Sequence, residues 1–481
     1  MIESLKPYSA YKASGMPWLG RIPKHWDVRR AKYFFREADD RSVTGDEELL
    51  SVSHITGVTP RSQKNITMFL AESNVGHKIC QPGDIVINTM WAWMAALGVA
   101  RQTGVVSPSY AVYRPISNNS ILPQYADHLL RTPAYAAEYV CASTGINASR
   151  LRLYPEQFLR MSILRPPVDE QANIVRFVAH ADSCIRSYIN AKRKLVALLN
   201  EQKQGIIHRA VTRGLDGDVR LKPSSIESLG DIPEHWAVVR FGRLIHLATG
   251  FPFRSDRFSQ SANDIRLLRG INVSPGRVRW DSVVYWPAGD IALFSPFELR
   301  SGDLVLGMDR PIVSGGVRVA EVSANDVPAL LLQRVARIRP RADLDAKFAL
   351  LLLGGKSFSD YLAPIFTGIS VPHISPEQIG GFRVALPPKP EQLRIVRYLS
   401  EATANIEAAV DRAVKEISLF REYRARLVAD VVTGKLDVRE AAVQLPDVTP
   451  EAGLEDEDPL REDDNESGGT EFDEIEEEAT T

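Results

Sequence analysis

Apolar residues recur every three or four positions over two long stretches of the chain, 166–216 and 387–437. This spacing places one apolar stripe along a helix and is typical of a coiled-coil seam. In the first stretch the predicted seam residues are Ile174, Val178, Ala181, Ile185, Tyr188, Leu195, Leu199 and Ile206. In the second stretch they are Ile395, Leu399, Ala402, Ile406, Ala409, Phe420, Tyr423 and Leu427. We therefore predict two long helices of about 44 residues, each about 66 Å long at about 1.5 Å per residue.

The two stretches are copies of each other. Aligned without a gap at an offset of 221, they are identical at 16 of 51 positions. A Pro-Pro pair precedes each helix, and Gly214 and Gly434 supply the expected stop. Lys192 and Glu416 interrupt the two seams, and polar seam residues often set register. Two equal helices favour pairing as a spacer over the alternative, in which each stripe packs only on its own domain.

A second repeat lies at the start of each half of the chain. LGRIPKHW at 19–26 and LGDIPEHW at 229–236 share Gly, Ile, Pro, His and Trp at an offset of 210. Each copy precedes a segment of about 140 to 150 residues that leads into a long helix. The order of lead-in, globular segment and helix therefore occurs twice.

The two globular segments share a frame and differ in their interiors. PGDIVI at 82–87 and SGDLVL at 301–306 each predict a turn followed by a short buried strand. Thr-Gly-Ile followed by Pro-Glu-Gln recurs near the end of both segments. Short β-branched runs separated by Gly, Pro and Asn predict a mixed sheet, whereas 121–140 is helical in pattern. The predicted fold class is α+β, with two divergent copies that perform one task on different targets.

The repeats define five segments. We predict a lead-in and first globular domain at 1–165, a first long helix at 166–216, a lead-in and second globular domain at 217–386, a second long helix at 387–440, and an acidic disordered tail at 441–481. One interpretation is that the acidic tail competes with DNA for binding to the basic remainder of the chain. The alternative is that it only makes the protein more soluble.

Charge is unevenly distributed along the 481 residues. Residues 451–481 carry 15 Asp or Glu against Arg461 alone, so the net charge of -2 leaves +12 on residues 1–450. This basic body suggests a polyanionic partner. The three cysteines, Cys80, Cys141 and Cys184, are too scattered for a disulfide framework or a zinc site, and they fit a reducing cytoplasm. The N-terminus lacks a signal-peptide pattern, and the apolar run at 90–100 is too short to span a membrane.

The sequence lacks the motifs of common enzyme classes. No GxGxxG follows a predicted strand, LGGKSF lacks the first glycine of a phosphate loop, and no HExxH occurs. The tetrapeptide Asn/Asp-Pro-Pro-aromatic of amino-methyltransferases is also missing. A nuclease-like Glu201-Gln202-Lys203 lies inside the first helix, where charged flank positions are expected. His25 and His235 fit packing roles beside Trp. We expect a chain without catalytic residues, without a bound cofactor and without a metal site.

Residues suited to nucleic acid are better represented. In the second globular segment, 237–386, 16 of the 18 basic residues are Arg, which binds guanine edges and phosphates through two donors. Trp91 and Trp93 are interpreted as core residues. The candidate DNA-binding residues are Lys64, Asn65, Ser109, Tyr110, Asn147, Arg150, Arg152, Arg266, Arg269, Asn272, Arg277, Arg279 and Arg318.

The lead-in KASGMPWLGRIPKHW, the repeated segments and the PPxxEQxxIV entry to each helix resemble the specificity subunit of type I restriction-modification enzymes. The likeness covers about residues 8–437. It implies two target recognition domains, each of which reads one half of a bipartite, asymmetric DNA site. It also implies that the two long helices pair as an antiparallel coiled coil and act as a ruler. The long acidic tail departs from the family pattern.

The resemblance further implies several partners. These are double-stranded DNA, two modification (methyltransferase) subunits that hold S-adenosylmethionine and methylate adenine, and two restriction (motor-nuclease) subunits that use ATP and Mg. No membrane partner is expected. One alternative is a DNA-targeting module of a methylation-only or phage-exclusion system. Another is a coiled-coil scaffold for proteins, which predicts no salt-sensitive affinity for DNA, whereas phosphate contacts predict a steep loss with salt.

Overall fold

The computed structural model describes residues 5–63, 73–117, 120–145, 151–313, 315–366 and 372–446. The chain divides into two compact units: unit 1 comprises 1–192 with 415–481, and unit 2 comprises 193–414. Each unit therefore contains one globular segment and one half of each long helix. Of the predicted acidic tail at 441–481, residues 447–481 lie outside the described residues, whereas 441–446 are described and include the end of a short helix at Arg439–Val443.

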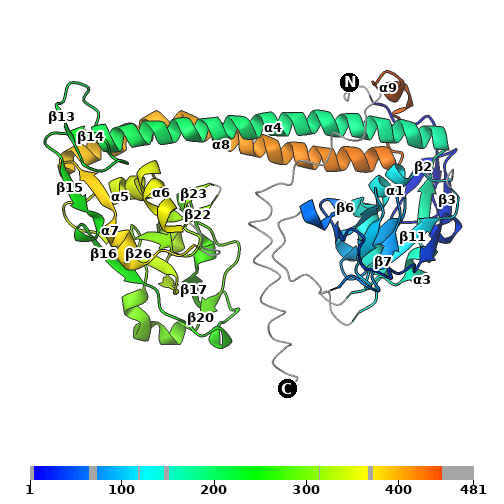
Figure 1. The fold of residues 1–481 in the computed structure, drawn as a ribbon, viewed down its shortest axis with the longest axis horizontal. Helices are drawn as coiled ribbons and strands as arrows, with labels where there is room; N and C mark the ends of the chain where they lie inside the picture. The colour runs from blue at the N-terminus through cyan, green and yellow to red at the C-terminus, as the bar shows by residue number, and fades with distance from the viewer. Residues whose placement is uncertain are drawn as a thin grey trace. The chain divides into compact units, whose positions relative to one another are not determined.

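The two predicted long helices are present as α4 (Val168–Arg213) and α8 (Lys389–Val432) (Figure 1). Their 46 and 44 residues correspond to about 69 and 66 Å at about 1.5 Å per residue. Ion pairs between them include Asp182–Arg424 at 2.8 Å and Lys192–Glu416 at 2.6 Å in unit 1, and Lys203–Glu407 at 2.6 Å in unit 2. In unit 1 the partner numbers fall on α8 as they rise on α4. In unit 2, Lys203 pairs with Glu407 and Gly214, just after α4, lies beside Glu391, so the helices are antiparallel within each unit. The predicted antiparallel pairing is confirmed.

The predicted seam contact of Tyr188 is present, because its ring stacks on that of Phe420 of α8 with the ring centroids 5.8 Å apart, although 60% of Tyr188 is exposed. Leu195 and Tyr423 are each 42% exposed, which is more than a buried seam predicts. Next to Tyr188, Ile189 is buried. Lys192 and Glu416, the two polar interruptions, contact each other.

The Glu-Gln pair of the helix-entry motif anchors the helix in both units. In unit 1, Glu170 accepts hydrogen bonds from Trp26 Nε1 at 3.0 Å and from the Tyr8 hydroxyl, and contacts His25 Nε2 at 2.7 Å. Gln171 accepts from the backbone N–H of Leu122 at 2.7 Å. In unit 2, Glu391 contacts His235 and Trp236 at 2.9 and 3.2 Å, and Gln392 accepts from the Asp345 N–H at 2.8 Å. The repeated His-Trp and Glu-Gln motifs therefore join the lead-in and the globular segment to the helix.

Unit 1 is built around a four-stranded antiparallel sheet in the order β4-β11-β8-β9, with short two-stranded ladders beside it (Figure 1). Its strands are β1 (Tyr11–Ala13), β2 (Arg21–Pro23), β3 (Asp27–Arg30), β4 (Phe35–Ala38), β5 (Leu50–Ser53), β6 (Gly57–Pro60), β7 (Lys78–Cys80), β8 (Ile85–Ile87), β9 (Leu97–Val99), β10 (Gly104–Val106), β11 (Ala111–Pro115) and β12 (Ser162–Arg165). Its short helices are α1 (Pro123–Leu130), α2 (Pro133–Ala142), α3 (Pro155–Arg160) and α9 (Arg439–Val443). The helical prediction for 121–140 is confirmed by α1 and α2.

Unit 2 repeats this frame. Its four-stranded sheet has the order β16-β26-β21-β24, and each strand takes the place of one strand in unit 1. The strands of unit 2 are β13 (Leu221–Pro223), β14 (Asp231–Pro233), β15 (Ala237–Arg240), β16 (Ile245–Thr249), β17 (Ile265–Leu268), β18 (Val273–Ser274), β19 (Arg277–Val278), β20 (Tyr285–Trp286), β21 (Leu304–Gly307), β22 (Ile312–Val313), β23 (Gly316–Val317), β24 (Val319–Glu321), β25 (Ala329–Leu331), β26 (Val335–Pro340) and β27 (Arg383–Leu386). Its short helices are α5 (Ala346–Leu353), α6 (Lys356–Leu362) and α7 (Pro376–Gly381). The predicted mixed α/β fold, present twice, is confirmed.

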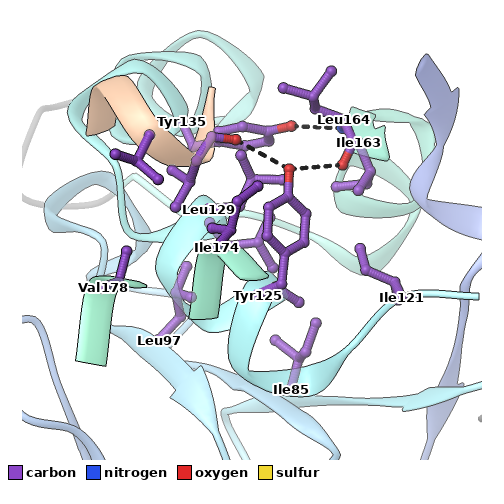
Figure 2. Close-up of a cluster of buried hydrophobic side chains, with 14 of the residues drawn as sticks. Ile85, Leu97, Ile121, Tyr125, Leu129, Tyr135, Ile163, Leu164, Ile174 and Val178 are labelled. Atoms are coloured by element: carbon purple, nitrogen blue, oxygen red, sulfur yellow. Dashed lines mark hydrogen bonds between the residues drawn. The ribbon is translucent and has the colours of Figure 1, made fainter. Parts of the chain in front are cut away.

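The core of unit 1 holds α4 against the sheet and its helices. Ile174 and Val178 of α4 are buried beside Ile85, Leu97 and Leu129 (Figure 2). Two buried tyrosines fix the neighbouring strand: Tyr135 donates to the Ser162 carbonyl at 3.0 Å and accepts from the Leu164 N–H at 3.2 Å. Tyr125 lies beside them and donates to the Val432 carbonyl of α8 at 3.0 Å. The globular part of unit 1 is thus packed on both long helices.

Within the described part of the chain, none of the helices combines the length and the apolar character that crossing a membrane would require.

Candidate nucleic-acid interface

The same end of both four-stranded sheets carries loops that differ between the units in length and sequence. In unit 1, Ile87 pairs with Ala111 and with Leu97, so β8 ends where β9 and β11 begin. In unit 2, β21 ends where β24 and β26 begin, with Leu306 paired to Val319 and Ala336. We call this the loop end. The loops gathered there are 39–49, 88–96 and 107–110 in unit 1, and 250–264, 308–318 and 332–334 in unit 2.

The opposite end of each sheet carries a shared ion pair. Arg114 Nη2 of β11 lies 2.9 Å from the buried Asp84, and Arg339 of β26 donates to the buried Asp303 at 2.8 Å. The hydrogen bonds to the two aspartates raise the pKa of both guanidinium groups, although burial opposes the shift. Each aspartate also accepts a backbone N–H from its own turn. This contact explains why Gly-Asp recurs in PGDIVI and SGDLVL. It stabilises the end of the sheet opposite the loop end, which is alike in the two units.

The loop end of unit 1 brings together three of the candidates from the sequence. Thr89 Oγ1 donates to the Ser109 carbonyl at 2.9 Å, and the Thr89 carbonyl accepts from the Leu153 N–H at 3.0 Å. Thr89 therefore links the segment that carries Arg152 to the loop that carries Ser109 and Tyr110, and the Arg152 guanidinium lies 3.9 Å from Met90 Sδ. Ser109 and Arg152 are exposed. Tyr110 is half-buried and accepts from Asn88 at 3.2 Å, and burial raises the pKa of its phenol.

Trp91 also lies at the loop end of unit 1, and its interpretation as a core residue is wrong. Its side chain is 53% exposed, whereas the neighbouring Ala92 is fully buried. A short 3-10 helix over Ala92–Met94 ends at Ala95, which adopts a left-handed φ of 58°. This tight turn buries the small alanines and leaves the indole outside.

Four of the unit 2 candidates hold the loops together from within. Asn272 is 1% exposed, and its amide donates to the carbonyls of Arg279 and Ser282 at 3.0 and 2.8 Å. Arg269 donates to Ser282, and Arg318 donates to the carbonyls of Val273, Asp309 and Gly270. Arg266 donates to the Asn325 carbonyl and lies 4.7 Å from the Trp280 ring centroid. The structure therefore gives all four a folding role.

Arg277 and Arg279 remain on the surface. Arg277 lies on β19, which forms a two-stranded ladder with β18, and Arg279 follows the strand. Both are exposed, and Arg279 pairs with Asp281 at 2.6 Å. Their role as DNA contacts stays a prediction, as it does for Ser109, Tyr110 and Arg152.

Sequence reasoning missed four residues at the loop end of unit 2. Asp309 lies 2.6 Å from His373 Nδ1 and 3.3 Å from Arg334 Nη1, and the backbone N–H of Arg310 donates to the Pro372 carbonyl. The Met308 carbonyl accepts from the Ile374 N–H at 2.9 Å, as the Thr89 carbonyl accepts from Leu153 in unit 1. The sequence held a signal for two of them. Asp309 follows SGDLVL by three positions, as Met90 follows PGDIVI. His373 follows Thr-Gly-Ile by four positions, where Arg152 follows its own copy by six.

Four candidates, Lys64, Asn65, Asn147 and Arg150, lie outside the described residues. Among the described residues, no group of three His, Cys, Asp or Glu side chains is placed to hold a metal ion.

Taken as a fold, the chain is a protein of two homologous α/β units that share a pair of antiparallel long helices and differ at the loop ends. No family model matches the sequence. It is 28% identical over 283 residues to the type I restriction enzyme MjaVIII specificity subunit of Methanocaldococcus jannaschii, a match that covers 59% of this chain and 64% of that one. It is 34% identical over 172 residues to the EcoAI specificity subunit of Escherichia coli, which covers 36% of this chain and 29% of that one.

A solved structure from a study of complex assembly and conformational transition of the type I R-M system has the same fold. It superposes with a TM-score of 0.56 at 16% identity, over 86% of this chain and 99% of that one. The chain is thus similar in sequence to type I restriction enzyme specificity subunits, and it shares the fold of a chain from a type I R-M system. The matched regions span less than two thirds of the two relatives named, so activity, substrate and partners are taken up as proposals.

Proposed function

We propose that this chain is the sequence-specific DNA-recognition subunit of a type I restriction-modification complex. In this proposal the loop end of each unit binds one half of a bipartite, asymmetric DNA site. The observation that carries the proposal is the duplicated sheet with different polar side chains at the same end: Ser109 and Arg152 in unit 1, and Asp309 and Arg334 in unit 2. Two copies of one frame with different contact residues are what an asymmetric two-part site requires.

The long helices would act as the ruler between the two half-sites. Major-groove sites on one face of DNA repeat about every 34 Å, so a fixed separation needs a rigid element of comparable length. At about 66 to 69 Å, each helix is long enough to provide it while overlapping with its partner. The ion pairs Lys192–Glu416 and Lys203–Glu407 support a defined register, because a shift of one turn would separate them.

The catalytic steps would belong to partner subunits. We propose two modification subunits, which hold S-adenosylmethionine and methylate adenine, and two restriction subunits, which use ATP and Mg. In this chain, side-chain donors and acceptors at the loop ends would discriminate bases, while basic residues around them would bind phosphates. The contribution of this chain is therefore the choice of site, with no covalent step of its own.

The test is to map adenine methylation across the genome, in cells that contain this chain with its modification partner and in cells that lack only this chain. We expect a gapped, asymmetric motif that disappears when the chain is absent. Methylation that does not depend on the chain would reject the proposal. A scaffold without DNA contacts is tested separately, because phosphate contacts predict a steep fall in affinity with salt and a scaffold predicts none.

A targeting module that methylates without restricting remains the second candidate. The same motif would then appear in the methylation map. DNA cleavage by the assembled complex on unmethylated DNA that carries the motif separates the two candidates, because only a restriction complex breaks the DNA.

A further inference from the structure

The cluster formed by Asp309, Arg334 and His373 has the geometry of a base-reading site. These residues come from three separate segments: the loop after β21, the turn before β26, and the segment before α7. Asp309 is the centre, with one carboxylate oxygen 2.6 Å from His373 Nδ1 and 3.3 Å from Arg334 Nη1. The side chain of Arg334 is 58% exposed, so most of its N–H donors face outward from the contact that its Nη1 makes with Asp309.

Hydrogen bonds from neighbouring segments hold the backbone that carries the cluster. Arg318 donates to the Asp309 carbonyl at 3.3 Å, and Met308 donates its N–H to the Arg334 carbonyl at 2.9 Å. The Ile374 N–H donates to the Met308 carbonyl, which fixes the segment that carries His373. A long side chain on such a support loses less conformational freedom on binding than one on a mobile loop.

Backbone conformation singles out the same two loops. Four non-glycine residues have a positive φ among the residues that the structure describes, and three of them, Ala95, Arg310 and Arg334, lie at the loop ends of the two sheets. Arg310 and Arg334 have φ values of 44° and 67°. A Cβ disfavours this conformation, which glycine adopts without strain, and residues kept in it concentrate at functional sites. Arg334 therefore carries a long charged side chain at a position whose backbone conformation glycine would adopt with less strain.

We propose that Arg334, oriented by Asp309 and His373, recognises the guanine of one G·C pair in the half-site bound by unit 2. The inference rests on the proposed function and adds the residue and the base. Guanine presents two acceptors, O6 and N7, to the major groove, and a planar guanidinium contacts both. Asp309 leaves the remaining donors of Arg334 available, and its negative charge fixes the orientation of the guanidinium. Arg318, Asp309 and His373 are positioning residues in this arrangement.

The experiment compares methylation motifs for the intact complex with the wild-type chain, Arg334→Ala and Arg334→Lys. We expect both variants to accept other base pairs at one position of the second half-site, with at least a tenfold loss of preference, while the first half-site stays unchanged. Lys keeps the positive charge but cannot contact O6 and N7 as a planar fork, so it separates base recognition from charge. Lys356→Ala is the matched control, because Lys356 is similarly exposed at 62%, pairs with Asp360, and lies on α6.

Each result has one interpretation. An unchanged motif with Arg334→Ala overturns the inference, and so does relaxation at both half-sites. If methylation disappears, the purified complex is used to select bound sequences from a random DNA pool. An intact first half-site with one degenerate position in the second then supports the inference, and any other pool overturns it. Absence of a gapped motif with the wild-type chain would instead reject the proposed function itself.

Discussion

One end of the four-stranded sheet carries the same contact in both units, and the other end carries different side chains. At one end, Asp84–Arg114 in unit 1 and Asp303–Arg339 in unit 2 form the same ion pair at corresponding positions, each between a buried aspartate and a partly exposed arginine. At the loop end, unit 1 presents Ser109, Arg152 and an exposed Trp91, whereas unit 2 presents Asp309, Arg334 and His373. The shared contacts stabilise a frame, and the differing contacts lie where the frame leaves side chains exposed. Duplication therefore preserved the support and changed the surface.

The largest effect is expected from breaking the shared ion pair. We expect Asp84→Ala and Asp303→Ala each to destabilise its own unit by about 3 kcal/mol, because a half-buried guanidinium loses its partner and the turn N–H loses its acceptor. Hydrogen exchange of backbone amides measures the effect unit by unit. Equal losses in both units would support the comparison. Removal of the exposed Asp281, which pairs with Arg279 on the surface, should leave exchange unchanged and serves as the control.

The helix-entry glutamates should differ in importance. Glu170 is almost completely buried and has three partners, Tyr8, His25 and Trp26, whereas Glu391 is more exposed and contacts the His-Trp pair of its own unit. We expect Glu170→Gln to destabilise unit 1 by about 2 kcal/mol and Glu391→Gln to destabilise unit 2 by about 1 kcal/mol, since hydrogen bonds to a charged group are lost in each.

Thermal unfolding together with amide exchange in each unit measures these losses. A larger loss for Glu391→Gln would contradict the order. The variant Tyr8→Phe is a useful companion, because it removes only the additional hydrogen bond of unit 1 and should reduce the difference between the two glutamates.

Arg152→Ala tests whether unit 1 uses its loop end as unit 2 does. We expect the first half-site to lose preference at one base pair by about tenfold, or about 1.4 kcal/mol, with the second half-site unchanged. Methylation mapping of the complex is the measurement. If the relaxed position appears in the second half-site, the assignment of units to half-sites is reversed. If neither half-site changes, Arg152 serves only the phosphate backbone or the surface.

The smallest effect is expected at the polar contact between the helices. Lys192 and Glu416 are each about one third exposed, so their ion pair should contribute about 0.5 kcal/mol. Lys192→Glu alone should lower the melting temperature slightly, and the exchange Lys192→Glu with Glu416→Lys should restore it. If the double variant is no more stable than the single one, the pair does not set the register.

The period of the apolar residues determined much of the architecture. The two long helices and the duplicated α/β frame were predicted, because each depends on local periodicity or on repetition within the chain. The antiparallel pairing of the helices came from the family resemblance. Sequence alone placed Leu195 in the seam, where it is 42% exposed. The rotation of a helix about its axis depends on which partner side chains it meets.

Only the tertiary structure decided which polar residues reach the loop ends. Arg318 and Arg334 look alike in sequence, since both stand in short loops beside β-branched runs. Arg318 is engaged by the Gly270 carbonyl, 48 residues away, whereas Arg334 is oriented outward by Asp309, which is itself held by His373 at a separation of 64 residues. Hydrogen-bond partners so distant along the chain leave no local pattern. The sequence by itself therefore determined the frame and its duplication, and the folded chain determined which side chains that frame exposes.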